Sequence, residues 1–283
     1  MVRTKQGWCA ACSRVVPEWA PGPGGRPGAR CPRCQALERH RFLALLVDRL
    51  SPVIASAGAL LDIAPQTQVR GLLEELAGDG YVGIDLLENR RVDVWADMTR
   101  LPFADATFDV AVCYHVLEHI PDDAAAMREL ARVLTPGGFA LVQVPWRRGA
   151  PTDEDPSAPE DVRIKRFGQA DHVRWYGKDL LDRLHAAGLR TSVLEPHMLL
   201  DPAAMSSLSV ADQEPVIICR RGGAGHVADA PTLRGHPQRD RLGPLGLRPG
   251  EPPPGFLRTQ AAKLPEPAKV ILRRVNSLGR TRR

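Results

Sequence analysis

Five apolar segments of five to seven residues alternate with longer stretches between residues 60 and 145. Each segment is a near-continuous apolar run bounded by turn residues, which is the pattern of a strand buried on both faces. The stretches between them are long enough for crossover helices. The alternation predicts an α/β fold with a Rossmann-like, doubly wound, seven-stranded and mostly parallel sheet. The expected strands are 60–65, 81–85, 92–97, 110–114 and 139–145, followed by 189–194 and 216–219.

Helical spacing of apolar residues predicts the elements that cover this sheet. One helix is expected over 37–50, ended by Ser51 and Pro52, and a crossover helix over 66–78, ended by Gly78. Asp122 is expected to cap the helix after the fourth strand, which Gly137 and Gly138 would end. A further helix is expected to start at Lys178.

Three carboxylates fall at the expected carboxyl ends of strands, namely Asp62, Asp85 and Asp97. Ligands of open parallel sheets bind at that edge, where the strand order reverses. Asp85 lies 23 residues beyond Asp62, a separation typical of an acid that accepts hydrogen bonds from a ribose diol. A carboxylate there repels a 2′-phosphate, so we expect a nucleoside with a free ribose.

Residues 115–119 read His-Val-Leu-Glu-His directly after the fourth expected strand, and residues 134–138 read Leu-Thr-Pro-Gly-Gly. With Asp97-Met98 before a Leu-Pro-Phe segment, the chain resembles the class I S-adenosylmethionine-dependent methyltransferases of the type 11 branch, over roughly residues 57 to 220. One departure concerns the first loop. The family has Gly-x-Gly-x-Gly there, whereas residues 64–68 read Ala-Pro-Gln-Thr-Gln.

The resemblance implies S-adenosylmethionine as the cofactor and methyl transfer as the reaction. The cofactor carries no phosphate, so a small Ala64 could serve where a pyrophosphate would demand glycine. Asp97 would accept from the adenine amine, or would only cap Thr99. A cofactor-free relic of the fold is the alternative that the missing glycines leave open. The implied cofactor-binding residues are Asp62, Ala64, Asp85, Leu86, Asp97, Met98 and Tyr114.

An insertion, 146–177, follows the fifth expected strand. Its part 149–161 is acidic and contains proline, which indicates a loop or lid, and its part 166–177 is dense in polar and aromatic residues. Substrate contacts are expected from Asp171, His172, Arg174 and Tyr176, and the candidate catalytic residues are His115, His119, His172 and Tyr176.

The two histidines most suited to proton transfer each have a structural alternative. His172 could remove a proton from an attacking hydroxyl or amine, or could cap the helix at Lys178 together with Asp171. His119 could be a general base, or could hold its loop in place.

Four cysteines in two Cys-x-x-Cys pairs, Cys9 with Cys12 and Cys31 with Cys34, are separated by eighteen residues. This spacing predicts a zinc ribbon over residues 1–36, with a structural Zn²⁺ and no open coordination position. Metal binding would supply the folding energy that this Pro- and Gly-rich segment lacks. A redox pair and disulfides are the alternatives.

The helix after Cys34 should fix the ribbon to the main domain, 37–221. Its residues Arg39, His40 and Arg41 could point into the mouth of the active site or lie on an exposed helix face. The two remaining cysteines, Cys113 and Cys219, fall in strands and are expected to be inert core residues.

The net charge of +5 is unevenly placed, because residues 222–283 hold twelve Lys and Arg against four Asp and Glu. The rest of the chain is therefore mildly acidic, which favours a small-molecule methyl acceptor over nucleic acid. Nine prolines in that segment predict a disordered tail, with one possible helix over 262–277. An RNA or protein methyltransferase and a non-catalytic cofactor-binding protein are the other hypotheses.

No apolar run approaches the ~20 residues of a membrane span, and the first five residues lack an apolar signal core. We therefore expect a cytoplasmic protein. The sequence leaves the oligomeric state open.

Overall fold

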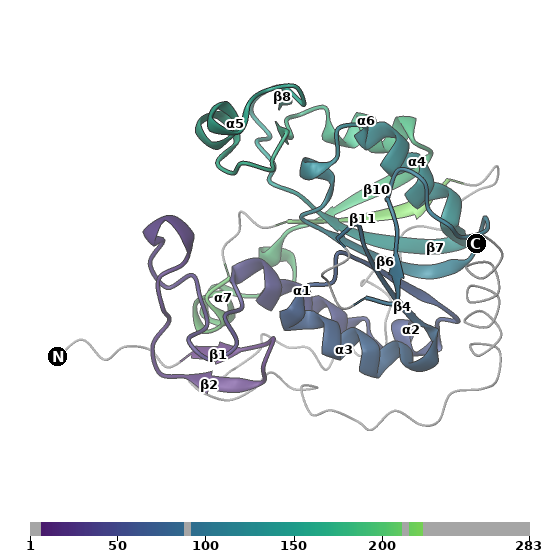
Figure 1. Ribbon diagram of the computed structural model, residues 1–283. Helices are drawn as coiled ribbons and strands as arrows, with labels where there is room; N and C mark the ends of the chain where they lie inside the picture. Colours follow the sequence, from purple (N-terminus) through teal and green to yellow (C-terminus); the bar gives the residue numbers. More distant parts are fainter. Residues whose placement is uncertain (1–6, 88–91, 211–214, 223–283) are drawn as a thin grey trace.

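The protein is described by a computed structural model over residues 7–87, 92–210 and 215–222 (Figure 1). The expected tail lies outside the described residues, apart from Gly222, and so does the helix expected over 262–277. None of the helices within the described ranges is long and apolar enough to cross a membrane.

The centre of the molecule is a seven-stranded sheet with the order β10-β11-β7-β6-β3-β4-β5. All neighbours are parallel except β11, which is antiparallel to both β7 and β10. The sequence-based prediction of a mostly parallel, doubly wound sheet is confirmed. Its strands are β3 (Leu60–Ile63), β4 (Tyr81–Asp85), β5 (Val94–Trp95), β6 (Phe108–Tyr114), β7 (Leu134–Gln143), β10 (Leu189–Leu194) and β11 (Val216–Arg221).

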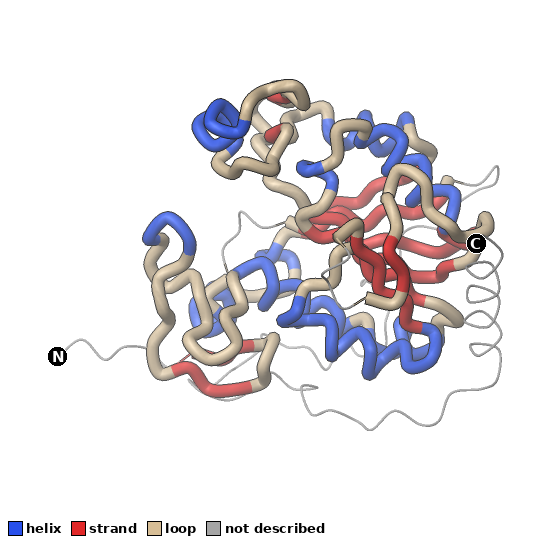
Figure 2. Tube along the Cα trace, in the orientation of Figure 1, coloured by secondary structure: helices blue, strands red, loops and turns tan. Residues whose placement is uncertain are grey.

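Helices cover both faces of this sheet, as Figure 2 shows with the strands in red between two blue layers. Successive strand residues point to opposite faces, so Leu60 packs into the core of one face and Leu61 into that of the other. Burying each such side chain contributes about 1.5–3 kcal/mol. One face carries α1 (Glu38–Arg49), α2 (Ser51–Ser56), α3 (Thr67–Ala77) and α7 (Pro202–Leu208), and the other carries α4 (Asp123–Val133) and α6 (Leu180–Ala186).

Several helix ends differ from the prediction. Helix α1 ends at Arg49, just before Ser51 and Pro52 as expected, but Pro52 then occupies the first turn of a second helix, α2, where proline costs no hydrogen bond. Helix α4 ends at Val133, before the turn at Gly137, whose φ of +88° suits glycine. The expected cap at Asp122 is confirmed, since its carboxylate accepts from the Ala125 amide at 2.9 Å.

The stretch 149–161, predicted to be a loop or lid, includes a two-residue strand and the start of a helix. The insertion as a whole contains β8 (Asp153–Glu154), α5 (Glu160–Phe167) and β9 (Arg174–Trp175), and β8 pairs with β9 antiparallel. A bridge between Trp146 and Tyr176 joins it to the chain leaving β7. The insertion therefore forms a separate two-stranded sheet attached beyond the carboxyl end of β7.

Four turns in the described part of the chain form short 3-10 helices. They are η1 (Pro23–Gly25), η2 (Gly78–Gly80), η3 (Leu117–His119) and η4 (Pro196–Met198).

The N-terminal segment forms a hairpin of β1 (Gly7–Cys9) and β2 (Arg14–Val16) with a small buried cluster of its own. It packs against α1 and α7, and Figure 1 shows it on the same side of the molecule as α5 and β8. The expectation that α1 fixes this segment to the sheet domain agrees with these contacts.

Arg41 makes the main polar connection of the N-terminal segment. It is fully buried and donates to the carbonyls of Ala29 and Ala36 in that segment, and to those of Leu208 and Ser209 at the C-terminal end of α7. The prediction of an exposed helix face is wrong for Arg41, because its guanidinium joins two parts of the core.

Candidate functional site

The carboxyl ends of β3 and β6 lie side by side at the centre of the sheet. The chain leaving β3 returns as β4 on one side, whereas β6 continues to β7 on the other. The strand order reverses here, so this edge is the expected place for a ligand.

The first loop after β3 lies at this reversal. Ala64 has a φ of +51° and its amide donates to the carbonyl of Ile84 at 2.8 Å. A left-handed residue with a Cβ costs about 1–2 kcal/mol, so the loop keeps a glycine-like conformation without glycine.

The side chain of Gln66 crosses between the two strands. Its amide donates to the carbonyl of Ala64 at 3.2 Å and to that of Tyr114 at 3.4 Å. Sequence reasoning missed this contact, since its only signal was a polar residue in a loop that should hold glycine. The two carbonyls are acceptors suited to an ammonium group.

Asp62 is brought to the same edge but is covered by Tyr81. It is 2 % exposed, and the Tyr81 hydroxyl donates to its carboxylate at 2.9 Å. Burial raises the pKa of Asp62 to about 7, against the opposing hydrogen bond from Tyr81. Asp62 therefore joins β3 to β4 and offers no surface to a ligand.

The other two predicted carboxylates reach the surface. Asp85 ends β4 and accepts from the amide of Leu87 at 3.0 Å, and Leu86 beside it is 67 % exposed. Asp97 accepts from the Thr99 amide and hydroxyl, both at 2.8 Å. The predicted cap of Thr99 is thus present, and both of its hydrogen bonds go to Oδ1 of Asp97.

The floor under this edge is apolar. Met98 is buried, and its sulfur lies 3.9 Å from that of Cys113 in β6. A cavity of about 430 Å³, within the range of small-ligand sites, lies between the first loop, α3 and the end of β4. It is lined by Pro65, Thr67, Arg70, Gly71, Glu74, Asp85 and Val92.

The turn after β6 brings together titratable side chains from two elements. His115 follows β6 with a φ of +56°, and its Nδ1 lies 2.9 Å from the carboxylate of Glu118, which is fully buried. His119 is the more exposed, with 31 % of its side chain accessible, and its Nδ1 lies 3.2 Å from the Asp171 carboxylate. His172 stacks edge-on against His119, with ring centroids 4.6 Å apart.

His172 itself is 4 % exposed. Burial lowers its pKa and the charge of Glu118 acts in the opposite direction. The predicted capping role of Asp171 and His172 is wrong, because Asp179 is the residue before α6 and Asp179 accepts from Thr152.

Arg174 and Tyr176, two expected substrate contacts, lie inside the protein. Arg174 is 1 % exposed and donates to the carbonyls of Leu117, Ile120 and Pro121. The Tyr176 hydroxyl donates to the carboxylate of Asp123 at 2.8 Å, and burial raises its pKa. Both side chains hold the turn after β6 against the insertion and present no surface to a substrate.

The N-terminus of α1 approaches the same loops. Arg39 is half-buried and His40 is 5 % exposed, with its Nδ1 accepting from the Leu37 amide at 3.2 Å. Burial, reinforced by the charge of Arg39, lowers the pKa of His40 to about 3. His40 interacts with both Gln66 and His115, so it lies beside the loops that follow β3 and β6. Of the two positions considered for His40 from the sequence, the active-site mouth and an exposed helix face, the first agrees with these contacts.

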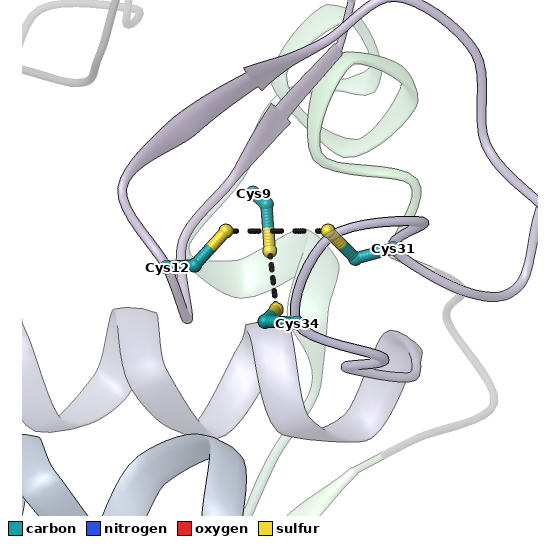
Figure 3. A group of neighbouring side chains, drawn as sticks. All are labelled: Cys9, Cys12, Cys31 and Cys34. Atoms are coloured by element: carbon teal, nitrogen blue, oxygen red, sulfur yellow. Dashed lines mark hydrogen bonds between the residues drawn. The ribbon is translucent and has the colours of Figure 1, made fainter.

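The four N-terminal cysteines converge on one point (Figure 3). Their sulfur atoms all lie within 4.8 Å of one another, with Cys9 to Cys34 at 3.6 Å and Cys12 to Cys31 at 4.0 Å. Zinc bound to four thiolates at about 2.3 Å requires sulfur atoms about 3.8 Å apart. The donor set therefore fits tetrahedral Zn²⁺ and leaves no position for a substrate.

In comparison with known proteins, residues 71–142 of this chain match the family described as "Methyltransferase domain". A "Probable S-adenosylmethionine-dependent methyltransferase" of Mycobacterium tuberculosis is 34 % identical over 107 residues, covering 30 % of this chain and 39 % of the relative. The demethylmenaquinone methyltransferase of Mycolicibacterium paratuberculosis is 50 % identical over 91 residues, covering 29 % of this chain and 40 % of the relative.

A third relative is the 27-O-demethylrifamycin SV methyltransferase of Amycolatopsis mediterranei, 44 % identical over 77 residues, covering 25 % of this chain and 28 % of the relative. The chain thus spans less than half the length of these three relatives. The crystal structure of an S-adenosylmethionine-dependent methyltransferase from Mesorhizobium loti is similar over 63 % of this chain and 97 % of that chain, with 17 % sequence identity and a TM-score of 0.43. A TM-score this low carries no argument about the fold.

Proposed function

We propose that the protein transfers a methyl group from S-adenosylmethionine to oxygen, nitrogen or carbon of a small molecule, since residues 71–142 match a family described as "Methyltransferase domain". The observation that carries the proposal is Asp85, an accessible carboxylate at the carboxyl end of β4, beside a glycine-like first loop. Relatives that act on demethylmenaquinone and on a demethylrifamycin support a small-molecule acceptor.

The residues at the sheet edge fit the nucleoside of this cofactor. Asp85 would accept from the ribose hydroxyls, and Leu86 with Met98 would flank the adenine. Asp97 would accept from the adenine amine with the carboxylate oxygen that Thr99 does not use. Asp62 acts indirectly in this proposal, by fixing β3 to β4 through Tyr81.

The methionine end of the cofactor would lie where β3 and β6 meet. The carbonyls of Ala64 and Tyr114 would accept from its ammonium group in place of the Gln66 amide. When bound, the cofactor supplies a sulfonium methyl that is already activated, so the protein mainly has to position the acceptor.

The acceptor would approach from the turn after β6 and the insertion. Among the proposed catalytic residues, His115 and His119 are partly exposed, and His119 is oriented by Asp171. His119 is therefore the histidine that we propose faces the acceptor, with His172 behind it and Tyr176 confined to a structural role.

We also propose that residues 1–36 form a zinc ribbon attached to a methyltransferase domain of residues 37–221. A zinc ion with four thiolates has a net charge of −2, and the guanidinium of Arg41 lies in the electrostatic field of these sulfur atoms. Zinc would thus stabilise the ribbon, and Arg41 would couple that stability to α1 and α7.

The test is transfer of isotope-labelled methyl groups from S-adenosylmethionine into a small-molecule extract of cells that lack the gene. A labelled product heavier than its precursor by one methylene is expected, at a rate that is insensitive to salt. Label recovered only in RNA or protein, with activity falling steeply as salt is raised, would contradict the small-molecule proposal.

A further inference from the structure

The cluster of Glu118, His119 and His172 has the composition and spacing of a divalent-cation site. One ligand atom from each residue lies within 4.8 Å of the others. Two imidazoles and one carboxylate are the donor set that first-row transition-metal dications accept while keeping open positions. Among the described residues this is the one such group besides the four cysteines.

Two buried atoms in the cluster lack hydrogen-bond partners. Glu118 is fully buried and its Oε2 has none, while its Oε1 meets only His115. The Nδ1 of His172, a residue 4 % exposed, has none either. Leaving a buried polar atom unsatisfied costs about 1–3 kcal/mol, more for a charged group. A cation bound by both atoms would remove that cost.

The surrounding contacts hold the ligands in place. The Val173 amide donates to the Glu118 carbonyl at 2.9 Å, which fixes His172 next to Glu118. Arg174 donates to three carbonyls of the same turn, and its charge is offset by Glu154 at 3.0 Å. Asp171 lies 3.2 Å from Nδ1 of His119, in the position of an outer-shell carboxylate that orients a metal-binding histidine.

We propose that Glu118, His119 and His172 bind one divalent transition-metal ion, with Asp171 orienting His119. The side chain of His119 is 31 % exposed, so the open coordination positions of the ion would face solvent beside His119. Those positions would take an oxygen atom of the methyl acceptor, and this last step alone rests on the proposed function. The ion binding itself does not require S-adenosylmethionine.

The experiment measures binding of Mn²⁺ to the full chain, with zinc already supplied to the cysteines and no cofactor present. Thiolates disfavour Mn²⁺, so the electron paramagnetic resonance signal of free Mn²⁺ reports the second site. We expect saturable binding of one ion per chain. His119→Ala, which changes a half-exposed side chain, should abolish it while the circular dichroism spectrum stays unchanged.

Further variants grade the effect. Asp171→Asn should weaken Mn²⁺ binding by about 10- to 100-fold, as loss of an outer-shell partner does, and Glu118→Gln by more than that. His185→Ala is the matched control, since His185 lies on α6 and pairs with Thr191. A free Mn²⁺ signal identical to that of buffer, or equal binding by the wild type and His119→Ala, would overturn the site. Methyl transfer with an intact cofactor but without such binding would leave the proposed function standing.

Discussion

Replacing Gln66 by alanine should strengthen binding of S-adenosylmethionine. The Gln66 amide donates to the carbonyls of Ala64 and Tyr114, the same acceptors that the ammonium group of the cofactor needs. The cofactor must displace that amide before it can bind. Position 66 has an extended backbone with a φ of −78°, so alanine introduces no strain there.

The magnitude follows from the two contacts. Both are neutral and long, at 3.2 and 3.4 Å, and a neutral hydrogen bond contributes about 0.5–1.5 kcal/mol. Their loss from the free protein should favour the bound state by about 1–2 kcal/mol, which is a factor of about 5–30 in the dissociation constant.

Isothermal titration calorimetry of Gln66→Ala with S-adenosylmethionine measures this change. Gln68→Ala is the control, because Gln68 lies on α3 and its side chain makes no hydrogen bond to either carbonyl, and the affinity of Gln68→Ala should equal that of the wild type. Unchanged or weaker binding by Gln66→Ala, with an unchanged melting temperature, would refute competition between the amide and the cofactor.

Three further predictions concern the cofactor, the zinc ribbon and the core. Asp85→Ala should weaken cofactor binding at least about 100-fold in calorimetry, because two hydrogen bonds to a carboxylate contribute about 1.5–3 kcal/mol each. The control Asp79→Ala, which changes an exposed carboxylate, should bind the cofactor as the wild type does. Equal affinities of Asp85→Ala and the wild type would count against the ribose contact. Cys31→Ser should contain no zinc when measured by elemental analysis and should have a lower melting temperature than the wild type. The control Cys219→Ala, which changes a cysteine in β11, should retain the ion. A wild-type protein without zinc would contradict the ribbon. Burial raises the pKa of Asp62 from about 3.8 to about 7, so its contribution to stability is complete below pH 3.8 and is lost as the pH rises through 7. Relative to Asp62→Asn, the free energy of unfolding of the wild type should fall by up to about 1.4 kcal/mol per pH unit between these two values and level off above pH 7. Parallel pH dependences of the two denaturant-derived free energies would contradict the buried, protonated carboxyl.

The fold could be predicted from the sequence because local patterns determine it. The apolar runs that became β3, β4, β6 and β7 are bounded by turn residues, and their continuity implies helices on both faces. Helix ends were less predictable. The sequence predicted that a helix ends before Pro52, and α1 does end at Arg49, but no local pattern showed that a second helix, which buries Ile54, begins at the same point.

The candidate site was predicted only as far as its position along the chain. The carboxylates do lie at strand ends, but whether a side chain faces a ligand depends on contacts between distant segments. Tyr81 covers Asp62, Arg41 meets the carbonyl of a residue 167 positions away, and Arg174 turns inward to carbonyls more than 50 positions earlier. No local pattern encodes such contacts. The sequence therefore listed Tyr176 and His119 alike as candidate catalytic residues, and only the structure shows that Tyr176 is buried whereas His119 is partly exposed.

Titration of S-adenosylmethionine into the zinc-loaded full chain tests the central claim most directly. We expect saturable heat with one cofactor per chain, and competition by S-adenosylhomocysteine, since both share the adenosine that Asp85 would hold. Absence of binding heat at millimolar cofactor would contradict the assignment of this sheet edge to a methyl donor.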